Sequence, residues 1–274
     1  MVDVNRRVLP GFGLSLGYTM LYLSFVVAVP MVAGALKASQ LSLDEFVGAA
    51  FSERAIAAYT LTLWTSFASA IVNVVFGGLV AWVLVRYDFP LKKLFDSLVD
   101  FPFALPTAVA GLVFSSLLVA NGWYGRFLVP LGIQGAYSRL GIVIVLVFIG
   151  FPFVVRTLQP VLESLERDVE EAAACLGADR LQTAVRVIFP SILPAVITGF
   201  ALAFARSLGE YGSVVFISGN MPFKTEIAPV LVVARLEEFA YGEAAAIAVV
   251  LLSISFFTLL SINLIERWSA RHHA

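Results

Sequence analysis

The residues best suited to chemistry are an arginine and a glutamate that interrupt an apolar stretch in the C-terminal third of the chain. Arg206 and Glu210 are the charged residues within positions 193–218, which the sequence predicts to be a membrane-spanning helix with Arg206 near its midpoint. A lone guanidinium at that depth costs at least about 2.5 kcal/mol. Because residues four apart share one face of a helix, Glu210 is placed to pair with Arg206.

Groups for catalysis or metal binding are scarce elsewhere. The two histidines, His272 and His273, lie next to the C-terminus, and Cys175 is the single cysteine. This leaves the body of the chain without the usual general base or imidazole ligands. We therefore expect no catalytic residue, no metal site and no cofactor in this chain. An intramembrane enzyme is a remote alternative. It would need paired carboxylates, or a Ser/Lys or His-containing set, at membrane depth, and Arg206 and Glu210 are the charges predicted to lie deep in a span.

The composition indicates a membrane protein. The chain has 274 residues, of which 60% are hydrophobic and 14% charged, whereas soluble domains are about one quarter charged. The net charge of −1 offers no basic field for a nucleic-acid backbone, so nucleic-acid binding is not expected.

Long intervals that are poor in charge predict the elements that position Arg206 and Glu210. A bilayer core about 30 Å thick needs about 20 apolar helical residues. Six intervals qualify or nearly qualify, at residues 14–36, 55–85, 101–120, 140–155, 193–218 and 244–265. The sequence thus predicts an all-α polytopic membrane protein with six transmembrane helices.

The third interval begins with two prolines, Pro102 and Pro106. They break regular backbone bonding, which lipid tolerates only where protein or a water-filled cavity covers the freed groups. We expect this region to face other helices or a pore. Lys and Arg are concentrated in the loops on the side of the termini, which predicts that both termini are cytoplasmic.

A strongly charged segment separates the fourth and fifth intervals. Between residues 163 and 186, apolar positions recur at helical spacing and are flanked by acids. These apolar positions are Leu165, Val169, Ala172, Ala173 and Leu176. Gly177 should end this short amphipathic helix, and a second helix should lead to Pro190. The segment is either a solvated loop helix or a docking helix whose small residues let a partner come close.

The spacing in this segment resembles a known motif. Glu171-Ala172-Ala173 is followed after three residues by Gly177 and after nine more by a stretch that ends at Pro190. This pattern resembles the EAA loop of ABC-importer permeases, with Val187 and Phe189 in place of the customary Ile and Leu. Four further stretches resemble the T-type membrane subunit of sulfate/thiosulfate importers, at residues 9–17, 100–111, 151–160 and 206–212.

The resemblance implies a type I ABC importer permease fold in the bacterial cytoplasmic membrane. Residues 1–54 would form the tail, first helix and external loop, and residues 55–274 a five-helix core. The implied function is import of sulfate or thiosulfate, with molybdate, tungstate or another oxyanion as the alternative. Implied partners are two ATP-binding subunits that hold ATP and Mg, a sister permease subunit, an external sulfate/thiosulfate-binding protein and membrane lipid. No phosphate-binding loop occurs in the chain, so another chain would hydrolyse the ATP.

The same resemblance implies two sets of site residues. Segment 163–190 would be the cytoplasmic coupling segment, with the ATPase contacts at Glu170, Glu171, Ala172, Ala173, Gly177, Asp179 and Pro190. Candidates for the pathway or its gate are Arg206, Glu210, Pro102 and Pro106. For Arg206 two interpretations stay open: an ion pair with Glu210 that fixes helix packing at a subunit interface, or a positive potential offered to a passing oxyanion.

Overall fold

The computed structural model describes residues 12–272, with no side-chain account for Arg167 or for residues 267–272. The described chain is helical throughout its regular structure, as predicted. The tail at residues 1–11, which includes the start of the 9–17 stretch, lies outside the described residues, as does His273.

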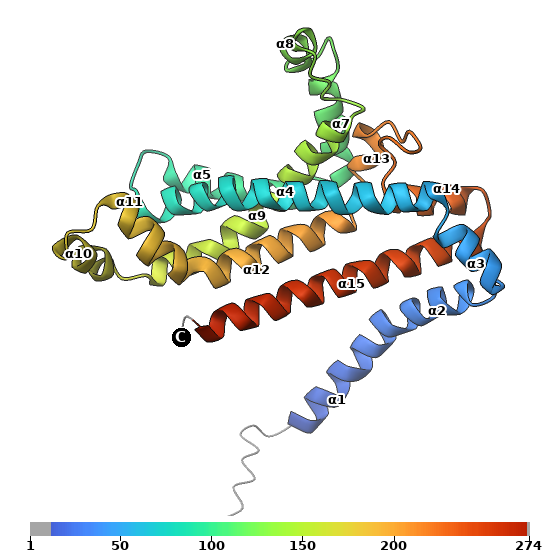
Figure 1. Ribbon diagram of the computed structural model, residues 1–274, viewed down its shortest axis with the longest axis horizontal. Helices are drawn as coiled ribbons and strands as arrows, with labels where there is room; N and C mark the ends of the chain where they lie inside the picture. The colour runs from blue at the N-terminus through green and yellow to red at the C-terminus, as the bar shows by residue number, and fades with distance from the viewer. Residues whose placement is uncertain (1–11, 273–274) are drawn as a thin grey trace, which may run out of the picture.

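Five long helices correspond to five of the six predicted spans (Figure 1). Their bounds are Phe12–Ala38 (α1 Phe12–Leu23, η1 Ser24–Ala28 and α2 Val29–Ala38), α4 Glu53–Arg86, α9 Arg139–Ser164, Arg180–Leu208 (α11 Arg180–Thr183, η3 Ala184–Ile188 and α12 Phe189–Leu208) and α15 Tyr241–His272. Serine caps begin two of them: Ser52 accepts a hydrogen bond from the Ala55 N–H, and Ser138 from the Gly141 N–H.

The third predicted span is broken into two short helices, α6 (Phe101–Ala104) and α7 (Thr107–Leu118). Leu105 is extended before Pro106, as the ring of a proline requires of the preceding residue. With 12 residues α7 is about 18 Å long, well short of a bilayer core. In Figure 1 it leaves the bundle across the direction of α4 rather than along it.

Shorter elements connect the long helices. They are α3 Leu43–Ala50, α5 Lys92–Val99, α8 Gly125–Leu128, η2 Val129–Leu131, α10 Arg167–Cys175, α13 Val214–Ile217 and α14 Ala228–Glu237.

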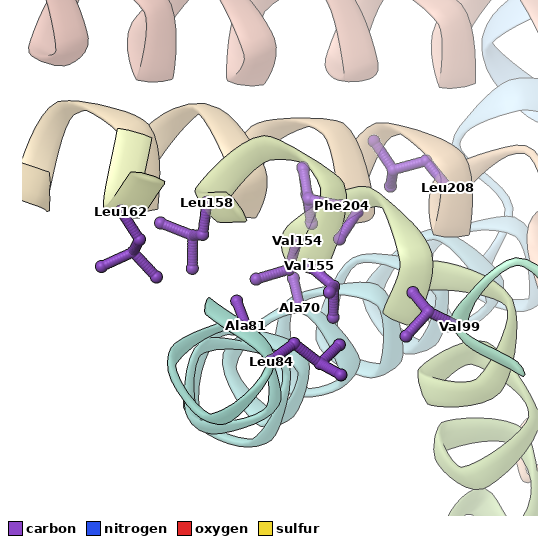
Figure 2. Packing of buried hydrophobic residues seen from close by; sticks show 11 residues of the cluster. Ala70, Ala81, Leu84, Val99, Val154, Val155, Leu158, Leu162, Phe204 and Leu208 are labelled. Carbon is purple, nitrogen blue, oxygen red and sulfur yellow. The ribbon is translucent and has the colours of Figure 1, made fainter. Parts of the chain in front are cut away.

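The centre of the fold is the packing of α4, α9 and α12 against one another. Figure 2 shows Leu84 of α4, Leu158 of α9 and Phe204 of α12 turned toward one buried cluster. Small residues on α4 allow the close approach: a Cβ at Gly77 would lie 3.2 Å from the Val154 side chain. By contrast, the most apolar window of the Phe12–Ala38 helix has no buried residue, and α2 packs against α15 at the edge of the fold.

A second close approach joins α7 to the chain that follows α12. A Cβ added at Gly111 would lie 2.2 Å from the Ser213 backbone oxygen, and one at Gly212 would lie 2.3 Å from Thr107 Oγ1. Real Cβ atoms do not come this close to backbone, so position 111 requires glycine, whereas at Gly212 rotation of the Thr107 hydroxyl would relieve the contact. The fold therefore brings together two of the stretches named above, 100–111 and 206–212.

We predict that Gly111→Ala destabilises the protein by roughly 1–3 kcal/mol, because the methyl group forces α7 away from Ser213. The midpoint of thermal unfolding in detergent measures this. Gly34→Ala in α2 is the matched control, since a Cβ there meets no atom within 4 Å, and it should be neutral or slightly stabilising. Equal midpoints for both variants would contradict the close approach.

Candidate functional site

Arg206 lies in the last turn of α12, which ends at Leu208. The prediction of a continuous helix over residues 193–218 with Arg206 near its midpoint is therefore wrong. Gly209 caps α12 with a non-helical conformation, and a turn precedes the short helix α13. Glu210 lies in that turn and not on the face of α12. The predicted pair nevertheless forms, with Arg206 Nη1 2.6 Å from Glu210 Oε2.

The two members of the pair differ in burial. The Glu210 side chain is 3% exposed and that of Arg206 is 33% exposed. Ser213 donates two hydrogen bonds to Glu210 Oε1, from its backbone N–H at 2.9 Å and from its hydroxyl at 3.0 Å. Both carboxylate oxygens are thus occupied, as a buried charge requires. Glu210 is fixed in the protein, while the guanidinium of Arg206 reaches the surface.

The prolines of the candidate gate begin helices instead of interrupting one. Pro102 lies in the first turn of α6, and Pro106 is the N-cap residue of α7. Helix α7 packs against α13, so Pro106 begins the element that covers the turn around Glu210. Pro102 belongs to α6, which packs against α9 instead.

A charged cluster that the sequence analysis missed lies beside Pro102. Arg156 of α9 donates two hydrogen bonds to the Asp100 carboxylate, from Nε at 2.8 Å and from Nη2 at 2.6 Å. Its Nη1 also donates to Asp96 Oδ1 at 2.7 Å. The cluster ties the α5–α6 region to α9. The one sequence signal for it is the spacing of Asp96 and Asp100, four residues apart ahead of the first proline.

Asp96 carries a second polar contact, with Gln159. The Gln159 amide donates to Asp96 Oδ1 at 2.9 Å. This hydrogen bond, together with the Arg156 guanidinium, holds the pKa of the Asp96 carboxyl below its usual range. Asp96 is therefore a carboxylate at neutral pH, and the link between α5 and α9 is ionic.

The segment between α9 and α12 has the predicted helix, glycine and helix. Helix α10 ends before Gly177, whose φ of +85° is the left-handed conformation that favours glycine. Asp179 then caps α11 by accepting a hydrogen bond from the Gln182 N–H at 2.8 Å. Pro190 lies in the first turn of α12.

The apolar face of α10 does not pack as its periodicity indicates. Ala173 is buried, but Leu176 is 89% exposed and Val169 is also exposed. Leu181 of α11 is 73% exposed. The apolar positions therefore form a surface at one end of the molecule, around α10 and α11 in Figure 1, instead of a contact with the bundle.

The predicted coupling residues divide between the two sides of this segment. Glu171, Ala172 and Gly177 are exposed on its outer side. Glu170 is turned the other way, where its Oε1 lies 2.7 Å from Nη2 of Arg86 at the end of α4.

The remaining polar groups give no sign of a metal centre. Within residues 12–272, apart from the side chains that are not described, no three His, Cys, Asp or Glu side chains are grouped to hold a metal ion.

Comparisons with known proteins agree on one family. The family model for the "Binding-protein-dependent transport system inner membrane component" matches residues 73–271. The "Sulfate transport system permease protein CysT" of Synechocystis sp. is 52% identical over 254 residues, covering 93% of this chain and 89% of that protein. The protein of the same name from Escherichia coli (strain K12) is 47% identical over 262 residues, covering 96% and 95%.

Solved structures with the same fold are more distant in sequence. A chain of a bacterial ABC transporter that imports the acidic polysaccharide alginate superposes with a TM-score of 0.77 at 19% identity, covering 97% of both chains. A chain of the inward-facing MetNI methionine ABC transporter superposes with a TM-score of 0.56 at 16% identity, covering 80% of this chain and 95% of that one.

We predict that Arg206→Ala lowers stability by roughly 1–3 kcal/mol, because it leaves the buried Glu210 carboxylate with one oxygen unpaired. Adding Glu210→Gln should recover most of the loss, since the amide still accepts the Ser213 hydrogen bonds without a charge. Thermal unfolding in detergent tests this cycle.

Arg235→Ala is the matched control for that cycle. It breaks ion pairs with Glu238 and Glu243, whose side chains are 50% and 43% exposed, and pairs with such exposed carboxylates contribute less than about 1 kcal/mol each. An Arg206→Ala chain as stable as the Arg235→Ala chain would show that the Arg206–Glu210 pair does not hold the turn together.

Proposed function

Because the chain belongs to the family of binding-protein-dependent transport system inner membrane components, we propose that it is the membrane-spanning subunit of an ATP-driven importer of sulfate or thiosulfate. The fold is that of an ABC importer permease, which confirms the predicted fold class. The observation that carries the substrate is the identity of 47–52%, over more than nine tenths of the chain, to permeases named for sulfate transport. Residues 1–54 would be an addition to a core at residues 55–274.

The coupling role rests on the exposed surface of the segment between α9 and α12. Leu176, Leu181 and Val185 are all exposed there. Leu176 lies between α9 and the Arg180–Leu208 helix, and Leu181 and Val185 lie in the first two turns of that helix. A surface of this kind is typical of a protein contact site. We assign it to ATP-binding subunits, two per transporter, which hold ATP and Mg because this chain has no phosphate-binding loop. Glu171, Ala172 and Gly177 would seat the segment, with Asp179 and Pro190 shaping its second helix, whereas the predicted contact Ala173 is buried within the chain.

The pathway role rests on the unequal burial of Arg206 and Glu210. Glu210 is held by Ser213 and restrains Arg206, whose remaining donors stay at the surface. A planar guanidinium suits the bidentate geometry of an oxyanion. Arg206 would therefore offer positive potential to the passing anion, and the chain breaks at Pro102 and Pro106 would permit the neighbouring helices to act as a gate.

A sister permease would complete the pathway. The outward face of α4 carries Trp64, Phe67 and Ile71, which are 64%, 52% and 44% exposed. Two grooves of about 590 Å³ and 810 Å³ meet at Trp64 and Ala68. A second permease subunit on this face would bury them between the two chains. An external binding protein would deliver sulfate or thiosulfate, and the choice against molybdate or tungstate would depend largely on that protein.

The orientation rests on charge distribution in the loops. Both termini and the coupling segment would lie in the cytoplasm of a bacterium, where Lys and Arg are in excess. In Figure 1 α4, α9 and α15 run in one direction and the Phe12–Ala38 and Arg180–Leu208 helices in the other, so the coupling segment lies at the end of the molecule where α4, α9 and α15 finish.

We predict that Gly177→Asp lowers sulfate uptake at least about tenfold at unchanged membrane abundance. The substitution places a charge on the docking surface at a position with a φ of +85° and open space around it. Uptake of labelled sulfate by whole cells and copurification of the ATPase measure the effect.

Gly177→Asn is the matched control, because asparagine has the shape of aspartate and tolerates the left-handed conformation without adding charge. It should keep most of the uptake. Normal uptake by the Gly177→Asp chain would show that this surface does not receive the ATPase.

We predict that the Arg206→Ala/Glu210→Gln chain assembles normally but imports sulfate at least about tenfold more slowly, because nothing replaces the positive charge. Arg206→Lys should give intermediate uptake, since it keeps the charge and loses the planar fork. Uptake normalised to membrane abundance measures this. Full uptake by the double variant would leave the arginine with a packing role alone.

A further inference from the structure

Arg86 is the last residue of α4, and its side chain is 11% exposed. Its Nη2 donates a hydrogen bond to the Leu165 carbonyl at 3.1 Å. The same nitrogen lies 2.7 Å from Glu170 Oε1, an ion-pair contact that lacks the alignment of a hydrogen bond. The guanidinium also lies over the Trp82 ring, 5.4 Å from its centre. A buried cation at the end of α4 thus has contacts on three sides.

The two polar partners lie on either side of one junction. Leu165 is the C-cap residue of α9, and its carbonyl is among the groups that a helix end leaves without a partner. Glu170 belongs to α10, the first helix of the coupling segment. Arg86 therefore binds the corner where the chain turns from α9 into that segment.

Chain connectivity makes this contact significant. The coupling segment is covalently continuous with α9 on one side and α12 on the other, but α4 is about 80 residues away in sequence. Helix α10 packs mainly against α11 and η3 of its own segment. The contacts of Arg86 are thus a direct polar link between α4 and the corner that leads into α10.

Glu170 and Glu171 point to different sides of α10. Adjacent residues on a helix are about 100° apart, and Glu171 is exposed while Glu170 is directed to Arg86. A partner on the outer side would leave the inner contact intact. The segment can therefore be held by α4 and by an ATPase at the same time.

We propose that Arg86 is a positioning residue that fastens the coupling segment to α4, so that α4 moves with α10 when the ATPase acts on the segment. This rests on the proposed function, since it takes the exposed side of the segment as the ATPase contact. Arginine suits the role because its planar guanidinium lies over the Trp82 ring while Nη2 contacts both polar partners, whereas lysine presents a compact charge without that planar face.

The test uses the complete transporter in proteoliposomes and measures sulfate imported per ATP hydrolysed. Arg86→Gln and Glu170→Gln should each lower this ratio about threefold or more, with ATP hydrolysis continuing. The Arg86→Gln/Glu170→Gln chain should be no worse than Arg86→Gln, because Arg86→Gln has already removed the contact with Glu170. Arg86→Lys should fall between Arg86→Gln and the unaltered chain.

Lys92→Gln is the matched control. It removes a cation near the same end of α4, from an ion pair with Asp88, which is 98% exposed. Its ratio should equal that of the unaltered chain. An unchanged ratio in both Arg86→Gln and Glu170→Gln, or an equal fall in Lys92→Gln, would overturn the proposal.

A distance measurement tests the link without relying on transport. Cys175 at the end of α10 is the single cysteine and is exposed, and Leu79→Cys adds a second exposed position on α4. With spin labels at both sites in the assembled transporter, Arg86→Gln should broaden the distance distribution and Lys92→Gln should not. An unchanged distribution in Arg86→Gln would refute the link. Absence of sulfate import by the unaltered chain would instead refute the proposed function, and the distance result would still decide on Arg86.

Discussion

The buried carboxylate of Glu210 is the constraint on which the arrangement around the candidate pathway depends. A carboxylate that is 3% exposed must find donors for both oxygens, since an unpaired charge in low dielectric is strongly destabilising. Ser213 supplies two donors and Arg206 a third. For Ser213 to reach Glu210, the chain must turn back on itself after Gly209. That turn directs α13 onto α7, and the approach is close enough that Gly111 has no room for a side chain against the Ser213 backbone. The end of α12, the turn and α7 thus form one unit.

The end of the molecule that carries α10 and α11 is organised by cations instead. Arg156 and Arg86 each lie near the end of a long helix and bind residues that are distant in sequence. Arg156 holds the α5–α6 region against α9, and Arg86 holds the junction of α9 and α10 against α4. The Arg156 cluster is partly exposed and can rearrange at lower cost than the apolar cluster of α4, α9 and α12, whereas the Arg86 side chain is only 11% exposed. The region that would receive the ATPase is therefore attached by ionic contacts.

The long helices could be predicted because the thickness of a bilayer fixes the minimum length of a charge-poor interval. The length is informative even where the order of apolar residues within the interval shows no clear periodicity. The break at Gly209 could not. The helix ends there because Gly209 caps α12 and Ser213 donates hydrogen bonds to Glu210. In the sequence, a glycine that ends a helix looks the same as a glycine inside a continuous helix. The contacts of Arg156 were equally invisible, because Asp96 and Asp100 come from a segment about 60 residues earlier. The periodicity of α10 correctly predicted an apolar face but not the direction in which that face points, because Leu176 is exposed. Periodicity indicates that an apolar face needs a partner, but it does not show whether that partner is the same chain or another one.

Helix α4 relates the two ends of the site. At its C-terminal end Arg86 contacts the proposed coupling segment, and near its middle Ser69 Oγ lies 3.2 Å from Ser207 Oγ, next to Arg206. These two contacts are about 26 Å apart along one continuous helix, at 1.5 Å per residue. Between them α4 packs closely against α9 and α12 through Gly77, Ala81 and Leu84, so the three helices would shift together. A displacement of α10 that moved Arg86 would therefore act at Ser207 as well, one residue from the guanidinium placed at the candidate pathway.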